Sequence, residues 1–358
     1  MAKRIGLALL ALIGLLALVA LLAQRQIGEW LFERAVNSTV GVDRSSDLPD
    51  GLHAYICGSG SPMPDADRAG PCIAVLAGER GFVFDAGSGS IRKLGRMGFP
   101  MDRLDAAFLT HLHSDHFDGL GELMLQAWMA GGRGSPLPIY GPEGTERVVA
   151  GFVEAYTIDR GFRIAHHGEA VARPGGFGGE ARTIRLAGSG RRGTVVYEGD
   201  GVTIRTLPVD HAPVDRAVAY RIDYGGRSLV ISGDTVRSPQ LARFARGADV
   251  LFHEALNPGM VGRIGEQLAE RGDADGAKIM ADIPDYHTSP EDAARVARDA
   301  GVRHLVLYHL VPAPPVKLME RVFLGEATKR FDAIDIAYDG MRVSLPAGTR
   351  DIALSDQL

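Results

Sequence analysis

The sequence is short of several features that mark particular classes of protein. Lys and Arg (39) are fewer than Asp and Glu (44), so the net charge is −5. Proteins that coat nucleic acid depend on an excess of Lys and Arg, and this balance excludes such a role, although it leaves room for a small basic groove. The chain also has no long run of like charge and no short repeat. Its 46 % apolar content is typical of a globular protein with a sizeable core.

Cysteine is almost absent, since Cys57 and Cys72 are the only two in 358 residues. They flank the turn-rich stretch GSGSPMPDADRAGP. In an oxidising compartment the pair would close this stretch as a disulfide, whereas in a reducing one they would be two small buried residues at strand ends. The sequence leaves both alternatives open. The glycines here do not form a P-loop, because no Gly-Lys-Ser/Thr follows them, and they predict a tight turn near the site instead.

Charge is missing altogether from residues 5–23, which carry no polar side chain. About 20 apolar residues span a bilayer, so the segment predicts an uncleaved transmembrane anchor. A cleaved signal peptide is the alternative, but its apolar core is usually about 7 to 15 residues and no A-x-A triplet ends this run. Lys3 and Arg4 precede the span, and the positive-inside rule then places the rest of the chain outside the cytoplasm, in the periplasm or an equivalent space.

After a polar stretch over residues 25–50, short apolar runs alternate with Gly, Pro and Asp. These runs predict an α/β protein with many short strands. Gly225-Gly226 predicts a two-residue hairpin turn, and DAIDIAYDGMRVSL predicts a second hairpin that turns at Asp339-Gly340. Ser289 followed by Pro290 predicts the start of a helix that ends before Gly301. Residues 161–192 are rich in Gly and Arg and predict a long loop of the kind that often serves as a lid.

The stretch LTHLHSDHFDG places four metal-ligand types within six positions, at His111, His113, Asp115 and His116. We expect His111 and His113 to end a strand with their side chains on the same side, because an extended chain has a period of two. Further ligand types follow other apolar runs, where α/β proteins gather their chemistry. They are His211, Asp234, His253 and His309.

HLHSDH matches the HxHxDH signature of the metallo-β-lactamase superfamily, and the order of the other motifs resembles its ribonuclease Z and arylsulfatase-like branch. CGSGSPMPDADRAGPC, FVFDAGSGSIRKL, LPIYGPEG, SGDT, HEAL, HTSPEDAARVA and LVLYHLVP occur in the order of that branch, and the likeness covers about residues 53–312. It implies an αββα sandwich of two mixed sheets with helices outside. We therefore expect an anchor over 1–24, a juxtamembrane linker over 25–50 and one metallo-β-lactamase-fold hydrolase domain over 51–358.

The resemblance assigns seven metal ligands. His111, His113 and His211 would bind one zinc ion, Asp115, His116 and His309 would bind a second, and Asp234 would bridge the two. Zinc takes imidazole nitrogen and carboxylate oxygen, and a pair of zinc ions activates a bridging hydroxide as nucleophile for a phosphoryl-type centre. Manganese or iron is the alternative metal. Asp115 would also act in catalysis, by orienting this hydroxide or taking its proton.

Three further residues have roles only through the resemblance. His287, in the family's HST-like position, would stabilise the transition state or protonate the leaving oxygen, with Glu254 as its orienting partner. Asp85 would support a ligand histidine by a hydrogen bond from outside the metal site. For His253 the same supporting role and simple packing are equally good interpretations. The remaining histidines have no motif and are expected to be structural or solvent-facing: His53, His166, His167 and His304.

The first function that we expect is a zinc-dependent phosphodiesterase or arylsulfatase-like hydrolase acting on a small-molecule or oligonucleotide ester. The alternative is a ribonuclease Z-type endonuclease that processes the 3′ end of tRNA. Ribonuclease Z proteins carry an extended tRNA-binding arm between the third histidine motif and the GDT motif, and here only 22 residues separate His211 from Asp234. Export would also separate the domain from precursor tRNA. The 161–192 loop would then select the substrate.

Two further classes are weaker alternatives, a lactone or β-lactam hydrolase and a non-catalytic binding module. The downstream motifs match the other branch better than the lactamases, and binding modules of this fold usually lose ligands, whereas all seven are present here. We expect the membrane, through the N-terminal helix, and a second copy of the chain as partners, since family members often dimerise.

Overall fold

The computed structural model describes residues 2–186 and 193–358 and divides the chain into two compact units, Met1–Ser46 and Asp47–Leu358. The first unit consists of helices α1 (Ala2–Leu22) and α2 (Gln24–Thr39). Within α1, the segment Lys3–Leu22 is long and apolar enough to cross a membrane, and none of it is buried. The polar stretch expected over residues 25–50 is therefore mostly helical, because α2 continues through it to Thr39.

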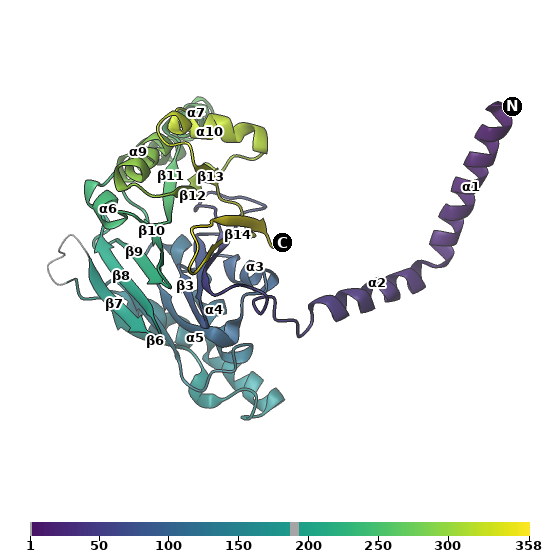
Figure 1. Ribbon diagram of the computed structural model, residues 1–358, viewed down its shortest axis with the longest axis horizontal. Coiled ribbons are helices and arrows are strands. Elements are labelled where there is room, and N and C mark those ends of the chain that lie inside the picture. The colour runs from purple at the N-terminus through teal and green to yellow at the C-terminus, as the bar shows by residue number, and fades with distance from the viewer. Residues whose placement is uncertain (1, 187–192) are drawn as a thin grey trace. The chain divides into compact units, whose positions relative to one another are not determined.

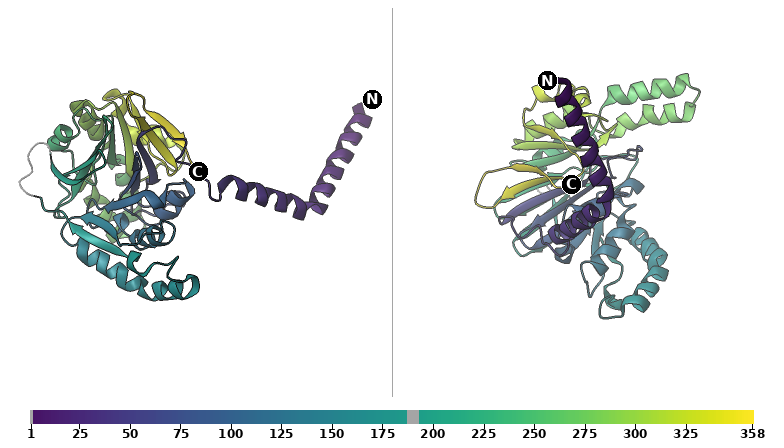
Figure 2. Two further views of the ribbon diagram at one scale, coloured as in Figure 1. Left: turned by 60° about the horizontal axis from the view of Figure 1, so that its bottom comes forward. Right: turned by 90° about the vertical axis from the view of Figure 1, so that its right-hand side faces the viewer.

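The second unit contains two mixed sheets (Figures 1 and 2). The first has eight strands, in the order β15 (Ala353–Asp356), β14 (Met341–Pro346), β1 (Gly51–Gly58), β2 (Cys72–Ala77), β3 (Arg80–Phe84), β4 (Leu104–Phe108), β5 (Leu137–Gly141) and β6 (Gly179–Thr183). The second has seven, in the order β13 (Ile334–Ile336), β12 (His304–Val311), β11 (Val250–Leu256), β10 (Arg227–Ile231), β9 (Val218–Tyr224), β8 (Val202–Pro208) and β7 (Thr194–Gly199).

Three apolar layers hold the unit together. The central layer lies between the sheets, where Phe84 and Phe108 of the first sheet pack near Tyr220 of the second. A second layer lies between the first sheet and its helices, α3 (Ser90–Arg96), α4 (Leu120–Met129) and α5 (Thr145–His167). The third lies between the second sheet and α6 (Pro239–Phe244), α9 (Pro290–Ala300) and α10 (Glu320–Leu324). The expected αββα sandwich is confirmed. Its central strands are apolar on both faces because both faces are covered.

Several local predictions agree with this architecture. Gly225 and Gly226 both have positive φ (56° and 76°) and connect antiparallel β9 and β10, as a two-residue hairpin requires. Helix α9 begins with the side chain of Ser289 accepting a hydrogen bond from the Asp292 amide at 3.2 Å, and Gly301 ends it with φ 64°.

The predicted hairpin at Asp339-Gly340 is wrong. Strands β13 and β14 do flank this turn, but β13 pairs with β12 in the second sheet and β14 pairs with β1 in the first. The chain therefore crosses from one sheet to the other at this point. Alternating sequence on either side of a turn is equally compatible with both arrangements, so the local pattern does not distinguish them.

The predicted loop over residues 161–192 is wrong in part. Residues 161–167 continue helix α5, and β6 at Gly179–Thr183 adds an edge strand to the first sheet by parallel pairing with β5. Residues 187–192 lie outside the described part of the chain. A pair of helices that the sequence analysis missed, α7 (Pro258–Glu270) and α8 (Ala274–Asp282), projects from the body of the domain (Figure 2, right).

Candidate metal centre

The seven predicted metal ligands come from four places in the chain and meet in two groups. Within each group, one ligand atom of every residue lies within 4.8 Å of the others. The first group comprises His111, His113, His211 and Asp234, and the second comprises Asp115, His116 and His309. All except His113 and Asp115 are buried.

The HLHSDH segment lies in the connection after strand β4. That strand ends at Phe108, so the expectation that His111 and His113 belong to it is wrong. The carboxylate of Asp85 accepts a hydrogen bond from the amide of Thr110 at 2.8 Å, which takes the place of a strand pairing at this point. A single turn of 3₁₀ helix over Ser114–His116 then reverses the chain and returns the second pair of ligands to the same centre.

Hydrogen bonds on the outer side of the rings fix the tautomers of His211 and His116. The Nδ1 of His211 lies 2.9 Å from the backbone oxygen of Tyr286, and a carbonyl only accepts, so Nδ1 carries the proton. The Nδ1 of His116 likewise donates to Asp85 Oδ2 at 2.9 Å. Each ring therefore turns its Nε2 toward the centre, and this is the atom through which it would bind metal.

His111 is oriented in the same way through Thr110. The hydroxyl of Thr110 donates its one proton to Asp85 Oδ2 at 2.8 Å, so it can only accept from His111 Nδ1 at 3.1 Å. Asp85 thus orients two ligand histidines, one directly and one through Thr110, which agrees with its expected supporting role. Sequence reasoning missed Thr110 and Tyr286, whose roles depend on a hydroxyl and a carbonyl oxygen that carry no motif.

The inward atoms are acceptors that face one another, and this arrangement needs a cation. The Nδ1 of His113 lies 3.0 Å from His111 Nε2 and 3.3 Å from His211 Nε2, and one proton on it could satisfy only one of these neighbours. The Oδ2 of Asp234 lies between the groups, 3.3 Å from the Nε2 atoms of both His116 and His309 and 3.8 Å from that of His111. The Nε2 of His116 and the Oδ1 of Asp234 are buried without a hydrogen-bond partner in the described part of the chain.

The protonation states favour the same conclusion. Burial lowers the pKa of His111 well below its usual value, and it also lowers the pKa of His113 and of His211, so these rings stay neutral. Burial alone would raise the pKa of Asp234, but His309 and His116 hold it well below the usual range, so the carboxylate is charged. Burial opposes a charge on His116, but the carboxylates of Asp234, Asp85 and Asp115 raise the pKa of His116 well above its usual value, so this ring is charged when no metal is present. A metal ion would take the place of that proton, and the donor set of nitrogen and oxygen fits zinc.

His287 lies beside this centre together with Glu254. Its Nδ1 is 3.2 Å from Glu254 Oε2, and its ring stacks on that of His309 with centroids 5.5 Å apart. Glu254 is fully buried, and its Oε1 accepts from the amide of Thr288 at 2.8 Å. Burial opposes a charge on His287, but the Glu254 carboxylate outweighs it and raises the pKa of His287 to about 9. One possible ligand atom of His287 also lies within 4.8 Å of those of Asp234 and His309, which the sequence did not indicate.

The other histidines lie outside both groups. His253 is fully buried with its Nδ1 against the carbonyl oxygen of Glu254 at 2.7 Å, so it packs within β11. His53 contacts the Pro49 carbonyl oxygen at 2.8 Å, and His304 pairs with Asp335 at 2.8 Å.

Comparisons with known proteins agree with the fold. The family model described as "Beta-lactamase superfamily domain" matches residues 80–310. A protein named Ribonuclease Z from Mycobacterium bovis (strain BCG / Pasteur 1173P2) is 37 % identical over 296 residues, which cover 82 % of this chain and 98 % of the relative. Another protein of that name, from Mycobacterium avium (strain 104), is 39 % identical over 264 residues, covering 73 % of this chain and 87 % of the relative.

Two solved structures share the fold at low sequence identity. The metallo-β-lactamase fold protein YhfI from Bacillus subtilis has a TM-score of 0.58 at 23 % identity, over 83 % of this chain and 100 % of its own. The short form of human tRNase Z has a TM-score of 0.57 at 20 % identity, over 82 % of this chain and 99 % of its own.

Asp85 provides a test of the centre. Replacement of a partner that orients ligand histidines typically weakens metal binding about 10- to 100-fold. Asp85 has φ 56°, a conformation that Asn tolerates, so Asp85→Asn removes the charge without backbone strain. We expect the zinc affinity, measured by competition with a chelator, to fall in this range. Asp105→Asn, which removes a carboxylate beside Arg80 and Tyr197, should leave the affinity unchanged. Equal affinities for both variants would contradict the role of Asp85.

Proposed function

The chain belongs to the metallo-β-lactamase superfamily, in its ribonuclease Z branch, and we propose that it is a two-zinc endoribonuclease that hydrolyses phosphodiester bonds in RNA. The observation that carries this proposal is the pair of ligand groups, with Asp234 of the first group close to His116 and His309 of the second. The chain that holds them matches a protein named Ribonuclease Z over 82 % of this chain and 98 % of that relative. The superfamily and the His/Asp cluster make the protein a metal-dependent hydrolase. Our proposal goes further in naming zinc as the metal, which rests on the donor set, and RNA as the substrate, which rests on the names of the relatives.

The residues of the site can supply the separate roles that phosphodiester hydrolysis needs: metal binding, a proton acceptor and a proton donor. When bound, two zinc ions lower the pKa of the attacking water and neutralise the phosphoryl oxygens. Asp115 is the least buried acidic ligand, and its Oδ2 lies 3.3 Å from His309 Nε2, so the carboxylate faces the centre and can take a proton from the water. His287, kept charged by Glu254, can donate a proton to the leaving oxygen.

The sequence favoured a phosphodiesterase or arylsulfatase-like hydrolase and gave a ribonuclease Z-type enzyme as the alternative. The present proposal prefers the ribonuclease. The missing arm between His211 and Asp234 counted against ribonuclease Z, and the structure places only the β9–β10 hairpin there. Relatives that carry the ribonuclease Z name nevertheless match most of the chain, so the missing arm carries less weight than the overall likeness. Action on sulfate esters finds no support in these comparisons. The suggested role of residues 161–192 in substrate selection has less support, since part of this stretch is helix and edge strand rather than loop.

The proposal is tested by assaying the purified chain on precursor tRNA, bis-p-nitrophenyl phosphate, p-nitrophenyl sulfate and a lactone side by side. We expect cleavage of the RNA and turnover of the model phosphodiester. Chelation should abolish both activities and zinc should restore them, because the ligands alone hold no nucleophile. His111→Ala should reduce turnover to background. Hydrolysis of only the sulfate or the lactone would overturn the proposal, and so would RNA cleavage that survives chelation.

The role of His287 predicts a pH dependence. A general acid is active while protonated, so turnover should fall as the pH rises through the pKa of His287. Glu254→Gln removes the charge that raises this pKa, and the alkaline fall should then move to lower pH by at least about one unit. His287→Ala should lower kcat about 10²- to 10⁴-fold and abolish this fall. The check is kcat from pH 6 to 10, and an alkaline limb that does not move in Glu254→Gln would exclude the assignment.

We also propose that α1 anchors the protein in the membrane and that the catalytic unit lies outside the cytoplasm. Three features support this proposal: the apolar, unburied segment Lys3–Leu22, the positive charges of Lys3 and Arg4 before it, and a disulfide between Cys57 and Cys72. An exported domain would meet RNA or another phosphodiester outside the cytoplasm, so the natural substrate need not be precursor tRNA.

Fusion reporters test this location. Alkaline phosphatase, which is active only after export, should be active when joined after residue 45, and a cytoplasmic fluorescent reporter at the same place should be silent. Replacing Leu15 and Leu16 in α1 by Arg should abolish export, because charges within the span oppose insertion. An inactive phosphatase fusion together with a fluorescent cytoplasmic reporter would refute the proposed location without affecting the proposed activity.

A further inference from the structure

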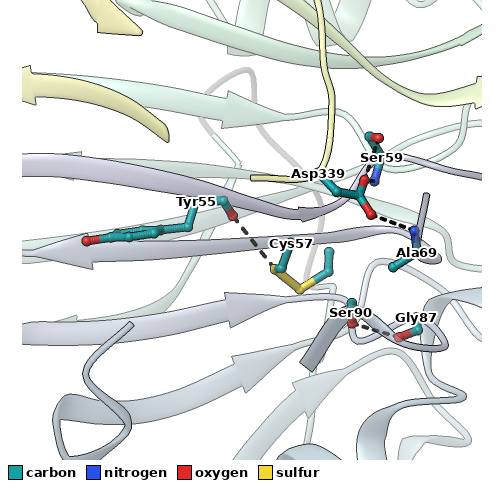
Figure 3. Close-up of a disulfide and its surroundings, with 8 residues drawn as sticks. Tyr55, Cys57, Ser59, Ala69, Gly87, Ser90 and Asp339 are labelled. Atoms are coloured by element: carbon teal, nitrogen blue, oxygen red, sulfur yellow. Dashed lines mark hydrogen bonds between the residues drawn. A yellow bond between two sulfur atoms is a disulfide. The ribbon is translucent and has the colours of Figure 1, made fainter. Parts of the chain in front are cut away.

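A disulfide joins Cys57, near the end of β1, to Cys72 at the start of β2 (Figure 3). Both residues are fully buried. Of the two alternatives left open by the sequence, the structure therefore has the disulfide. The bond closes the segment 58–71, which we call the clasp loop.

The first end of the clasp loop is bonded to the segment that carries His309. The amide of Leu310, the next residue, donates to the carbonyl oxygen of Ser59 at 3.1 Å. His309 itself has φ 45°, a left-handed conformation that is unfavourable for a histidine. The bond from Leu310 to Ser59 thus lies directly beside the bend that aims His309 at the centre.

The second end of the clasp loop is bonded to the turn beside Asp115. The amide of Gly70 donates to the Ser88 oxygen at 3.0 Å, and that of Gly87 donates to the Pro71 oxygen at 3.0 Å. The backbones approach so closely that a Cβ on Gly87 would lie 2.3 Å from the carbonyl carbon of Gly70 and 2.4 Å from the oxygen of Asp115. This contact explains why glycine is needed there.

Asp339 ties the two ends of the clasp loop together a second time (Figure 3). Its carboxylate accepts from the amide of Ser59 at 2.8 Å and from the amide of Ala69 at 2.6 Å, and it pairs with Lys93 at 2.6 Å. The side chain of Asp339 is only 3 % exposed, so the link is shielded from water.

The ends of the clasp loop therefore contact the two separate chain segments that supply the second ligand group. Asp115 and His116 follow a strand of the first sheet, and His309 belongs to a strand of the second. The first ligand group has weaker links to the clasp loop. His211 is held by Tyr286, and His111 is connected to the segment beside the loop only through Thr110 and Asp85.

We propose that the Cys57–Cys72 disulfide is a positioning device for the second metal: it holds the ends of the clasp loop together and thereby sets the distance between Asp115–His116 and His309. The proposal rests on the two-metal site of the proposed function. Without the bond, 14 residues rich in Gly, Pro and Asp join the ends, and such a segment has many open conformations in which the second ligand group is spread apart. The first group is connected to the loop only indirectly, so the second metal should respond more strongly than the first.

The test compares zinc binding by the full-length chain in detergent with that of a Cys57→Ala/Cys72→Ala variant. Chelator competition gives the two dissociation constants separately. The wild-type chain should bind two zinc ions. In the variant the first constant should remain within about threefold and the second should rise at least tenfold. A metal count near one at limiting zinc should accompany this rise.

Two further variants separate positioning from general stability. Asp339→Asn keeps the disulfide but loosens the same loop ends, and it should raise only the dissociation constant of the second zinc ion. This variant also tests the proposal if the cysteine variant does not fold. Asp249→Asn breaks a buried ion pair with Arg227 at the start of β11, away from the ligand ends of the strands. It should lower the melting temperature and leave both constants unchanged.

The possible outcomes are distinct. If the cysteine variant keeps both constants, or loses both zinc ions to the same degree, the disulfide only stabilises the fold and the proposal is overturned. If the wild-type chain binds fewer than two zinc ions, the proposed function itself fails, whatever the variants do.

Discussion

The attraction between one buried carboxylate and the histidines around it governs the architecture of the site. Asp234 is 2 % exposed, and its Oδ2 lies within 3.9 Å of the Nε2 atoms of His111, His116, His211 and His309. Removing such a charge from water is costly unless opposite charge compensates for it. When no metal is bound, His309 and His116 supply this compensation and keep Asp234 ionised. Bound metal ions would supply it in their place.

This constraint explains why many polar groups around the site form hydrogen bonds that orient the ligand histidines. Asp85, Thr110 and the carbonyl oxygen of Tyr286 use their hydrogen bonds to orient the rings, so that the Nε2 atoms face the centre. Glu254 serves His287 differently, since its negative charge keeps a proton on the ring. Two sets of histidines with opposite protonation therefore lie within a few ångströms of each other, and their carboxylate partners establish the difference.

The parts of this structure that the sequence predicted have strong local signals. The ligand residues follow apolar runs and form a recognisable spacing, and Ser289-Pro290 marks a helix start. The helix α7 had a comparable signal in Asn257-Pro258, since the Asn257 side chain caps the Met260 amide at 2.9 Å, and a stricter search for caps would have found it. The separation of β13 and β14 into different sheets had no local signal, because it depends on pairing partners distant in the chain. The same holds for the clasp loop, whose contacts with Asp115 and Leu310 are made only in three dimensions.

The pairing of β1 with β14 has a consequence for the order in which the protein can fold. Gly51 lies opposite Pro346, so the first strand of the catalytic unit pairs with a strand that is synthesised much later. Contacts between such distant residues form slowly, because a long chain must be closed before they contribute. During synthesis this edge of β1 is therefore exposed until β14 has been made, and unpaired edges of this kind favour association with other chains. A chain truncated before β14 should consequently be a strong client for chaperones, even though it still contains every ligand of the metal centre.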